Sequence, residues 1–267
     1  FTRVLLDEAT QATEPASLVP LVRGARQIVL VGDHRQLPPT VISRRAENGG
    51  LRRSLFERLV AMGIEPMLLD TQYRMHPAIS DFPNRTFYEG RLVDGITAAD
   101  RPNPAGLLWN DWEVPMAFLP VNGDELLSPD GASKENPAEA GWVAKILENL
   151  LQAGDLEETN IGIITPYAGQ VRAIRDALPE RNDSVEVHTV DGYQGREKEV
   201  IIFSCVRSNS DGIVGFLSDA RRLNVALTRA KRGLIVIGDP DTLRNDETWA
   251  SWLDYCLLYT SPSPRDS

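Results

Sequence analysis

The chain is poor in the residues that build disulfide frameworks and metal centres. Its 267 residues include two cysteines and three histidines. Two cysteines cannot form a framework of disulfides, and the histidines lie too far apart in sequence to show zinc-ligand spacing. An intracellular, reducing compartment is the default for such a chain.

A membrane span, a signal peptide and a phosphate-binding loop are also missing from the sequence. No apolar run approaches the roughly 18 residues that a span needs, so no membrane partner is expected. No G-x-x-x-x-G-K-[ST] segment, the loop that cradles nucleotide phosphates, occurs. The chain starts with Phe1-Thr2-Arg3, without an initiator methionine, and we expect it to be part of a longer polypeptide.

The charge balance argues mildly against non-specific binding of nucleic acid. The formal net charge is −10 and the pI is near 4.9. Nucleic-acid-binding domains commonly carry a basic patch and a high pI. Basic residues nevertheless recur inside the polar segments described below, so the sequence is compatible with a locally basic groove on an acidic protein.

Short apolar runs alternate along the chain with segments of helical period. Strands buried between helix layers read as continuous apolar runs, and their alternation with helices indicates parallel sheets. The sequence therefore predicts an α/β fold with parallel sheets that carry helices on both faces. The expected strands are residues 4–6, 27–31, 67–69, 116–121, 161–165, 185–188, 200–205 and 234–237, and the expected helices are 15–22, 51–62, 77–87, 138–151, 168–178 and 223–231.

The pattern breaks near Asp70. Residues 1–69 are predicted to form the end of one sheet domain, and residues 70–255 a second, nearly complete one. Residues 256–267 are rich in Ser and Pro and interrupt a helical run at 249–253. We expect this tail to be a native disordered linker or a non-native segment left by cloning or sequence assembly.

Two polar segments follow the first two expected strands, at the strand end where ligands bind in folds of this kind. Asp7 would hold Mg²⁺, usually through water, and Glu8 would polarise the water that attacks a γ-phosphate. The carboxamide of Gln36 both donates and accepts hydrogen bonds and would sense that phosphate. Each segment on its own is more typical of a solvated strand end or a tight Gly-Asp turn.

Two arginines and a tyrosine lie in two further polar segments. Tyr73 would stack on a base. Arg74 would neutralise charge on a transferring phosphoryl group, as an arginine finger does, with a rate effect of ~10³ or more. Arg229 is the second candidate and is expected on a helix, with Arg222 on about the same face. A single arginine on a helix is usually a surface charge.

The remaining candidates lie at turns and strand ends. Gly195 belongs to a turn that permits close backbone approach, and Glu197 after it would bind ribose hydroxyls. The alternative is an ordinary turn before a strand. Two strand-end segments would hold nucleic-acid phosphates, or would equally well cap the next helix. These segments are Thr165-Pro166-Tyr167 and Thr189-Val190-Asp191.

In this order and at this spacing, the polar segments resemble those of superfamily 1 helicases over residues 4–253. Within that superfamily the chain is similar to the Upf branch, the regulators of nonsense transcripts. The residues that carry the resemblance include Asp7-Glu8-Ala9-Thr10-Gln11, Gln72-Tyr73-Arg74-Met75-His76-Pro77, Ile163-Ile164-Thr165-Pro166-Tyr167, Gly195-Arg196-Glu197-Lys198-Glu199 and Asn224-Val225-Ala226-Leu227-Thr228-Arg229-Ala230.

The resemblance implies two RecA-like domains, with ATP and Mg²⁺ bound between them and single-stranded RNA or DNA running across both. It also implies translocation from 5′ to 3′. The site residues carried over by the resemblance are Asp7 and Glu8 as the Walker B metal and base residues, Gln36 as the γ-phosphate sensor, Tyr73 on adenine, Arg74 and Arg229 on the γ-phosphate, and Glu197 on the ribose.

The function implied is an ATP-dependent helicase of RNA surveillance, such as nonsense-mediated mRNA decay. Its partners would be decay or translation-termination factors, in the cytoplasm or alternatively the nucleus. Senataxin-like and immunoglobulin-switch-binding-like helicases share several segments, so RNA versus DNA stays open. The phosphate-cradling loop would lie upstream of Phe1 in the same polypeptide, so we expect these 267 residues alone not to hydrolyse ATP efficiently. A chain natively this short would instead be a non-catalytic binding module.

Overall fold

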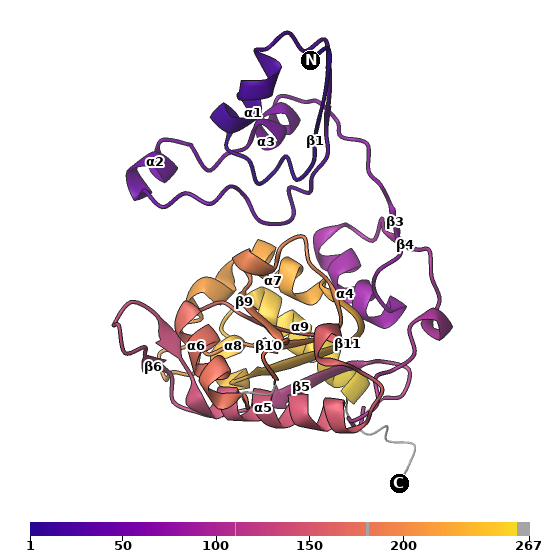
Figure 1. Ribbon diagram of the computed structural model, residues 1–267, viewed down its shortest axis with the longest axis vertical. Coiled ribbons are helices and arrows are strands. Elements are labelled where there is room, and N and C mark those ends of the chain that lie inside the picture. The colour runs from indigo at the N-terminus through magenta and orange to yellow at the C-terminus, as the bar shows by residue number, and fades with distance from the viewer. Residues whose placement is uncertain (110, 180–181, 261–267) are drawn as a thin grey trace. The chain divides into compact units, whose positions relative to one another are not determined.

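The chain folds as two compact units that divide after Leu69. The computed structural model describes residues 1–109, 111–179 and 182–260. One unit comprises Phe1–Leu69 and the other Asp70–Ser267. Figure 1 follows both units by colour along the chain. That they correspond to two RecA-like domains stays a prediction.

The unit Phe1–Leu69 is built around two parallel strands. Strands β1 (Arg3–Leu6) and β2 (Gln27–Leu30) pair from Arg3 opposite Gln27 to Leu6 opposite Leu30. Helix α3 begins at a capping box, in which Ser54 and Glu57 satisfy each other's backbone N–H groups. An ion pair between Arg58 and Glu14, at 2.7 Å, joins α3 to α1. The helices of this unit are α1 (Glu14–Leu21), α2 (Arg44–Asn48) and α3 (Leu55–Ala61).

The apolar side chains of these two strands are largely open to solvent. Leu5 is 67% exposed and Val29 is 56% exposed. The prediction that these strands are buried between helix layers is therefore wrong for the chain as the structure describes it. An apolar run favours a strand, but burial also requires an element that packs on each face.

The unit Asp70–Ser267 contains a five-stranded parallel sheet in the order β5-β11-β10-β8-β9. The long strand β11 lies between β10 and β5, and β10 lies between β11 and β8. All four neighbouring pairs are parallel, so the carboxyl ends of the strands share one edge. The strands are β5 (Met116–Pro120), β8 (Ile161–Thr165), β9 (Glu186–Thr189), β10 (Lys198–Ser204) and β11 (Ala230–Gly238).

Helices cover both faces of this sheet. On one face, Val143 and Leu147 of α5 and Ile174 of α6 form a continuous apolar core with side chains of β8, β10 and β11. On the other, Trp249 of α9 stacks on Phe203 of β10, with ring centroids 6.0 Å apart. The predicted α/β class is thereby confirmed, and Figure 1 shows α5 along one face. The helices are α4 (Pro77–Phe87), α5 (Pro137–Gln152), α6 (Ala168–Ala177), α7 (Ala220–Leu227), α8 (Pro240–Leu243) and α9 (Glu247–Thr260).

Small elements complete the connections of this unit. Short strands β3 (Thr71–Gln72) and β4 (Val93–Asp94) form a parallel pair. A hairpin of β6 (Leu126–Leu127) and β7 (Lys134–Glu135) precedes α5. Single 3₁₀ turns are η1 (Ala98–Asp100), η2 (Glu158–Asn160), η4 (Asp191–Tyr193) and η5 (Gly215–Ser218).

Several expected elements differ from the structure in their bounds, and three of them show what decides the difference. Residues 67–69 form no strand, and the pairing begins at Thr71 instead. The helix expected over 51–62 starts at Leu55, because Ser54 caps it. The helix expected over 223–231 ends at Leu227, and β11 begins at Ala230. Pairing of this segment with β10 in the sheet outweighs its local helix preference.

The last described helix runs further than the sequence indicated. Helix α9 continues to Thr260, five residues into the segment 256–267 for which we expected disorder or a non-native sequence. The prediction of disorder is wrong for residues 256–260, because the backbone there continues the helix. Residues 261–267 lie outside the described part of the chain. A non-native origin of the tail stays a prediction.

Candidate functional site

In the unit Phe1–Leu69, the two predicted polar segments lie at the same edge of the strand pair. The N–H of Ala9 donates to the carbonyl oxygen of Val31 at 2.8 Å, so the loops after β1 and β2 touch. A Cβ on Gly32 would lie 3.0 Å from the backbone nitrogen of Thr10, so the close approach favours glycine. The segments carrying Asp7 and Gln36 are thereby brought together.

The polar side chains at this edge are organised by local hydrogen bonds. Asp7 accepts from the backbone N–H of Glu8 at 2.9 Å, and Glu8 accepts from Gln11 at 2.8 Å. Glu8 itself has a positive φ of 50°, which bends the chain sharply at the strand end. Gln36 donates to Asp33 Oδ2 at 2.9 Å. This bond orients its carboxamide, the group predicted to sense a phosphate.

Asp7 has the chemistry that a magnesium site requires. Mg²⁺ is usually bound through one or two carboxylates, with water and substrate phosphates completing the shell. Asp7 is exposed at the strand end and carries such a carboxylate. Among the described residues, no group of three or more His, Cys, Asp or Glu side chains converges. The described residues therefore contain no metal site that is built from protein ligands alone. A Mg²⁺ ion that keeps several water ligands and also binds substrate phosphate fits the carboxylate of Asp7.

In the unit Asp70–Ser267, three segments that are distant in sequence converge on Glu197. Arg74 Nε lies 2.5 Å from Glu197 Oε2, and Lys231 Nζ lies 3.1 Å from Oε1 of the same carboxylate. Arg74 Nη1 also donates to the carbonyl oxygen of Thr228 at 3.0 Å. We call Arg74, Glu197, Thr228 and Lys231 the Glu197 cluster. It unites two predicted site residues that lie 123 positions apart.

The cluster favours the ionised form of Glu197. Partial burial opposes ionisation, but hydrogen bonds from Arg74 and Lys231 outweigh it and lower the pKa of this carboxyl. Lys231 also lies 3.6 Å from Glu199. The two cations Arg74 and Lys231 therefore balance the two carboxylates Glu197 and Glu199 at the amino ends of β10 and β11.

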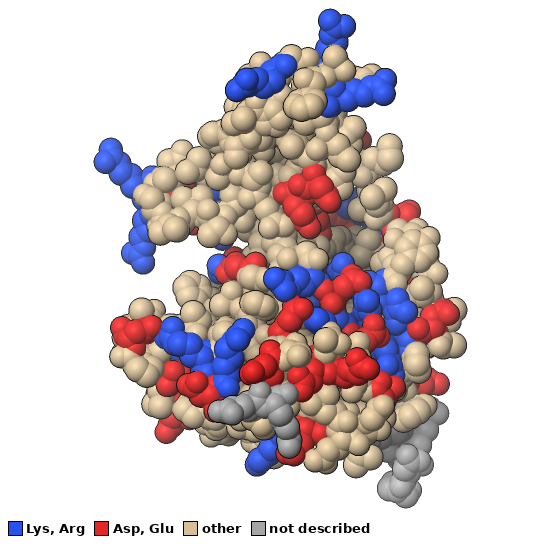
Figure 2. Space-filling view, in the orientation of Figure 1, with Lys and Arg blue, Asp and Glu red and all other residues tan. Residues whose placement is uncertain are grey.

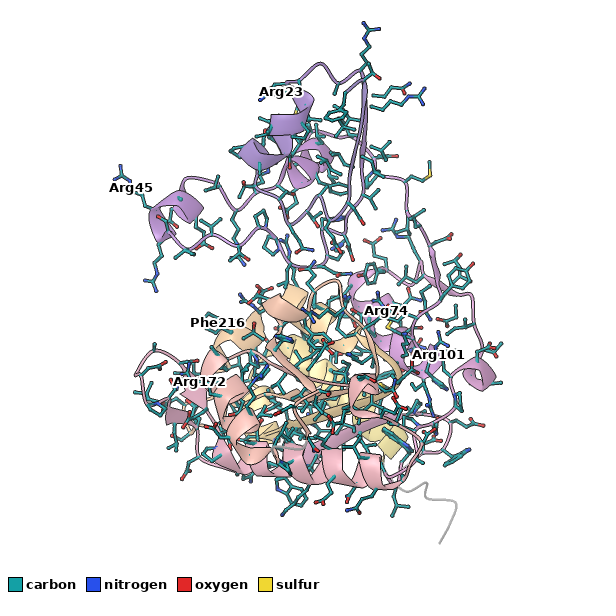
Figure 3. The ribbon with its side chains drawn as sticks, viewed as in Figure 1. Arg23, Arg45, Arg74, Arg101, Arg172 and Phe216 are labelled. Atoms are coloured by element: carbon teal, nitrogen blue, oxygen red, sulfur yellow. The ribbon has the colours of Figure 1, made fainter. Side chains whose placement is uncertain are left out.

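Arg101 holds the backbone of the segment that carries Tyr73 and Arg74. Its guanidinium donates to the carbonyl oxygens of Arg74 at 2.8 Å and Tyr73 at 2.9 Å. Figure 3 labels Arg74 and Arg101 on neighbouring segments. The ring of Tyr73 packs on Gly95, where a Cβ would collide with it, and the residue is 64% exposed. Tyr73 therefore presents a supported aromatic surface, and stacking of this ring on a base stays a prediction.

Arg229 occupies a different environment from the one expected. It lies after the end of α7 rather than on a helix, and it is 3% exposed. Its Nε donates to the carbonyl oxygen of Val225 at 3.1 Å and its Nη2 to Thr228 Oγ1 at 2.9 Å. These bonds close the carboxyl end of α7, where a cation is favoured by the helix dipole. Contact of Arg229 with a γ-phosphate stays a prediction.

The predicted nucleic-acid segments meet at the carboxyl edge of the sheet, but some of their side chains are inside. Thr165 is fully buried, and its hydroxyl has no hydrogen-bond partner among the described residues. Val190 is also buried, and its N–H donates to the carbonyl oxygen of Thr165 at 3.0 Å. The hydroxyl of Thr189 accepts from the N–H of Gly192 at 3.3 Å. Asp191 is exposed.

Gly195 is conformationally required in its turn. Its φ is +78°, a region that side chains disfavour, and no atom lies near the position of a Cβ. Glycine is therefore favoured here by the backbone angle, and close approach of this turn to a nucleotide stays a prediction. The turn delivers Glu197 to its cluster.

A buried ionic group beyond the strand ends was not predicted from the sequence. Arg207 Nε lies 2.7 Å from Glu125 Oε2, and Lys134 Nζ lies 2.6 Å from Glu125 Oε1. Burial opposes ionisation of Glu125, but these partners, with Ser208 and Asn209, lower its pKa to about 2. Arg207 also donates to the hydroxyl of Tyr167 at 3.3 Å. The position of Arg207 just after a strand was the available signal.

Glu139 was missed for a different reason. It lies in the first turn of α5, where an acidic residue ordinarily faces solvent and stabilises the helix dipole. Here it is fully buried and accepts from Ser204 Oγ at 2.6 Å and from the N–H of Val206 at 2.9 Å. Burial raises its pKa to about 8, against the opposing hydrogen bonds. No sequence pattern distinguishes such a glutamate from a surface one.

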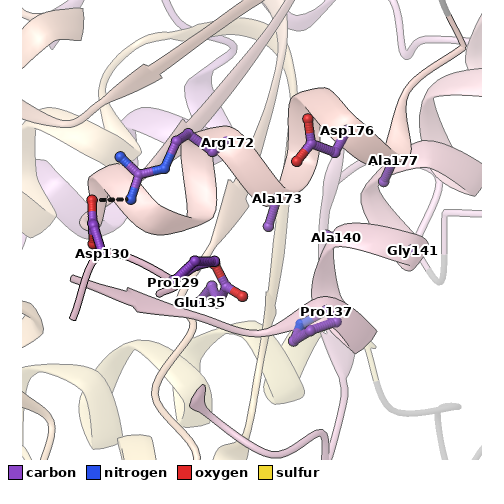
Figure 4. Close-up of a pocket in the computed structure, with 10 residues that line it drawn as sticks. All are labelled: Pro129, Asp130, Glu135, Pro137, Ala140, Gly141, Arg172, Ala173, Asp176 and Ala177. Atoms are coloured by element: carbon purple, nitrogen blue, oxygen red, sulfur yellow. Dashed lines mark hydrogen bonds and ion pairs between the residues drawn. The ribbon is translucent and has the colours of Figure 1, made fainter. Parts of the chain in front are cut away.

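A cavity between α5, α6 and the β6–β7 hairpin lies apart from these groups. Its volume is about 620 Å³, and Arg172 pairs with Asp130 beside it at 2.6 Å. Figure 4 shows that helix side chains such as Ala140 and Ala173 form much of its wall. None of the predicted site residues lines this cavity.

Comparison with protein families extends these observations. A family model described as an AAA domain matches residues 51–241, and a second model, also described as an AAA domain, matches residues 1–44. Together the two models include all of the predicted site residues. No helix among the described residues has the length and apolar character to cross a membrane.

Curated relatives match almost the whole chain. A protein named regulator of nonsense transcripts 1 homolog from Drosophila melanogaster is 47% identical over 262 residues, covering 96% of this chain and 22% of its own length. The Neurospora crassa protein of the same name is 48% identical and is covered over 23% of its length. The ATP-dependent helicase NAM7 of Saccharomyces cerevisiae is 46% identical, over 93% of this chain and 26% of its own. The chain thus spans about a quarter of these relatives, and the predicted resemblance to the regulators of nonsense transcripts is confirmed.

Proposed function

This chain belongs to the AAA domain family, and from that membership we propose that it is a working part of an ATP-dependent helicase. The helicase would translocate 5′ to 3′ on single-stranded RNA or DNA, in RNA surveillance such as nonsense-mediated mRNA decay. The names of the relatives support this proposal. Among structural observations, the Glu197 cluster carries it, because it gathers three of the predicted segments around one carboxylate.

Each predicted residue would have its own role in ATP hydrolysis. ATP with Mg²⁺ supplies the phosphoryl group that is transferred to water. Asp7 would hold the metal through water, Glu8 would accept a proton from the attacking water, and Gln36 would report on the γ-phosphate. Arg74 and Arg229 would stabilise the negative charge that develops.

In the Glu197 cluster, the carboxylate keeps Arg74 extended and paired at 2.5 Å. An incoming phosphate would compete for that guanidinium, while Lys231 continues to neutralise Glu197. Glu197 would then be available to accept hydrogen bonds from ribose hydroxyls, and Tyr73 would stack on adenine. Thr165, Pro166, Tyr167, Thr189, Val190 and Asp191 would form the nucleic-acid side, with backbone groups serving where side chains are buried.

Activity would depend on a phosphate-cradling loop that is not among these 267 residues. We therefore propose that the 267 residues alone hydrolyse ATP poorly. Decay or translation-termination factors would be the protein partners, in the cytoplasm or alternatively the nucleus. A non-catalytic binding module is the second candidate, and the net charge of −10 together with the missing loop favours it for the isolated chain.

The test is the substitution Arg74→Ala in the full-length gene product. We expect kcat for ATP hydrolysis to fall ~10³-fold, because an arginine finger has an effect of that size. The affinity for a single strand, measured by fluorescence anisotropy, should change little. Arg85→Ala is the matched control, because Arg85 is 68% exposed in its side chain and pairs only within its own helix with Asp81 among the partners described. Hydrolysis by Arg74→Ala at the rate of the control would contradict the proposal.

A further inference from the structure

An exposed aromatic ring projects from the carboxyl edge of the five-stranded sheet. Phe216 lies in η5, between β10 and α7, and is 55% exposed. Figure 3 shows it at the surface of the unit Asp70–Ser267. The residue took no part in the predicted site, and the proposed mechanism does not use it.

The ring is held in place by two neighbours. The ring of Tyr167 lies with its centroid 5.4 Å from that of Phe216, at an interplanar angle of 41°. The Arg222 guanidinium carbon lies 5.2 Å from the Phe216 centroid, a cation–π contact. The hydroxyl of Tyr167 also accepts from the backbone N–H of Phe216 at 3.4 Å. Both the ring and its backbone are therefore anchored.

The backbone that carries the Phe216 ring is tightly packed. Gly215 has a φ of +60°, and a Cβ there would collide with the Arg207 guanidinium. Arg207 is in turn fixed by Glu125 at 2.7 Å and by the Tyr167 hydroxyl at 3.3 Å. The ring is therefore fixed before a ligand binds. It loses little conformational entropy when a ligand covers it.

The charges around the ring point to the part of a nucleic acid that would bind. Arg222 lies 3.5 Å from Asp191 and 3.6 Å from Asp219. These two carboxylates offset its positive charge, so the site does not offer a free cation to a phosphate. Figure 2 likewise shows acidic and basic side chains interspersed over the visible face of this unit. The exposed part of the Phe216 ring, beside its contacts with Tyr167 and Arg222, is what remains for recognition.

We infer that Phe216, backed by Tyr167 and flanked by Arg222, is a stacking site for one unpaired nucleobase. The inference rests on the proposed function, because it assumes that a single strand crosses this edge of the sheet. Aromatic side chains bind successive bases of single strands by stacking, without preference for sequence. The predicted contact residue Tyr167 then acts as a positioning residue, since it is buried beneath the ring.

The experiment is a set of Phe216 variants of the full-length gene product, titrated by fluorescence anisotropy with a labelled oligouridine strand. Phe216→Ala should bind roughly fivefold to a hundredfold more weakly, because loss of one stacked base has an effect of this size. Phe216→Trp should bind like the wild type. Phe216→Leu keeps an apolar side chain on Tyr167 and should still lose binding, with an unchanged melting temperature. Ile213→Ala, which alters a residue 54% exposed on the same loop, is the matched control.

Two further readouts separate stacking from other roles. A strand that carries abasic sites should bind the wild type and Phe216→Ala equally, because no base is left to stack. The slope of log affinity against log salt should be the same for both proteins, since no phosphate contact is removed. Wild-type affinity in Phe216→Ala, or an equal loss on the abasic strand, would overturn the inference while leaving the proposed function intact. Failure of the wild type to bind any single strand would overturn both.

Discussion

The two units are both built on parallel strands, but the side chains of those strands are buried to different degrees. Both place polar segments at the carboxyl ends of parallel strands. In Asp70–Ser267, strand residues such as Ile202 and Val236 are completely buried between helix layers. In Phe1–Leu69, Leu5 and Val29 are more than half exposed although their strands are equally apolar. Apolar composition selects strands, whereas burial depends on what packs against them.

The difference has a consequence for the candidate sites. The Glu197 cluster joins segments from three parts of the chain and rests on a packed sheet. The edge that carries Asp7 and Gln36 combines hydrogen bonds within three residues along the chain with a backbone hydrogen bond between its two loops. The first arrangement pairs charged side chains from distant segments, whereas the second orients side chains in local turns and joins its two loops through the backbone.

The largest expected effect is on the free energy of unfolding, and it compares a buried residue of the sheet unit with an exposed strand residue of Phe1–Leu69. Trp249→Ala should cost about 3–5 kcal/mol, the range for deleting a buried tryptophan. Trp249 is fully buried, stacks on Phe203 and donates its Nε1–H to the carbonyl oxygen of Leu217 at 2.9 Å. Leu5→Ala, at an exposed strand position, should change stability by no more than about 0.5 kcal/mol. Urea unfolding measures both, and equal losses would break the comparison.

The next effect concerns pH. Glu139 has a folded-state pKa of about 8, above its ordinary value of 4.5. Its proton stabilises the folded state below pH 4.5, and this contribution is lost as the pH rises to about 8. With about 1.4 kcal/mol for each pKa unit, the loss amounts to a few kcal/mol.

The variant Glu139→Gln tests this assignment, because an amide cannot ionise. Stability of the variant, measured by urea unfolding at several pH values, should fall less than that of the wild type between pH 5 and pH 8. Tryptophan fluorescence reports this unit, since all five tryptophans lie after Asp70. Parallel curves for the two proteins would show that another group titrates.

The smallest effect lies in the Phe1–Leu69 unit. Ser54→Ala removes the side chain that accepts from Glu57 N–H at 3.1 Å and should destabilise α3 by about 1 kcal/mol. Thr13→Ala is the matched control, because Thr13 precedes α1 without a side-chain capping bond. Amide hydrogen exchange in α3 measures the effect. Equal protection in the two variants would mean that the capping box contributes nothing.

Much of the sheet unit could be predicted from the sequence because its strands are short, continuous and apolar. Strand β8 has the predicted bounds, and α5 extends the predicted helix by one residue at each end. Arg229 shows the limit of this approach. Its segment favours a helix locally, yet pairing of the following residues with β10 places it beyond the end of α7.

The sequence by itself determined the alternation of strands and helices, the polar segments at strand ends and the family. Those properties arise from local propensity and from residue order, which neighbouring residues along the chain carry. Tertiary structure decided that Arg74 pairs with Glu197, that Glu139 is buried and that Phe216 is anchored at the surface. Each of these depends on contacts between residues more than 45 positions apart, whose energies no local pattern records.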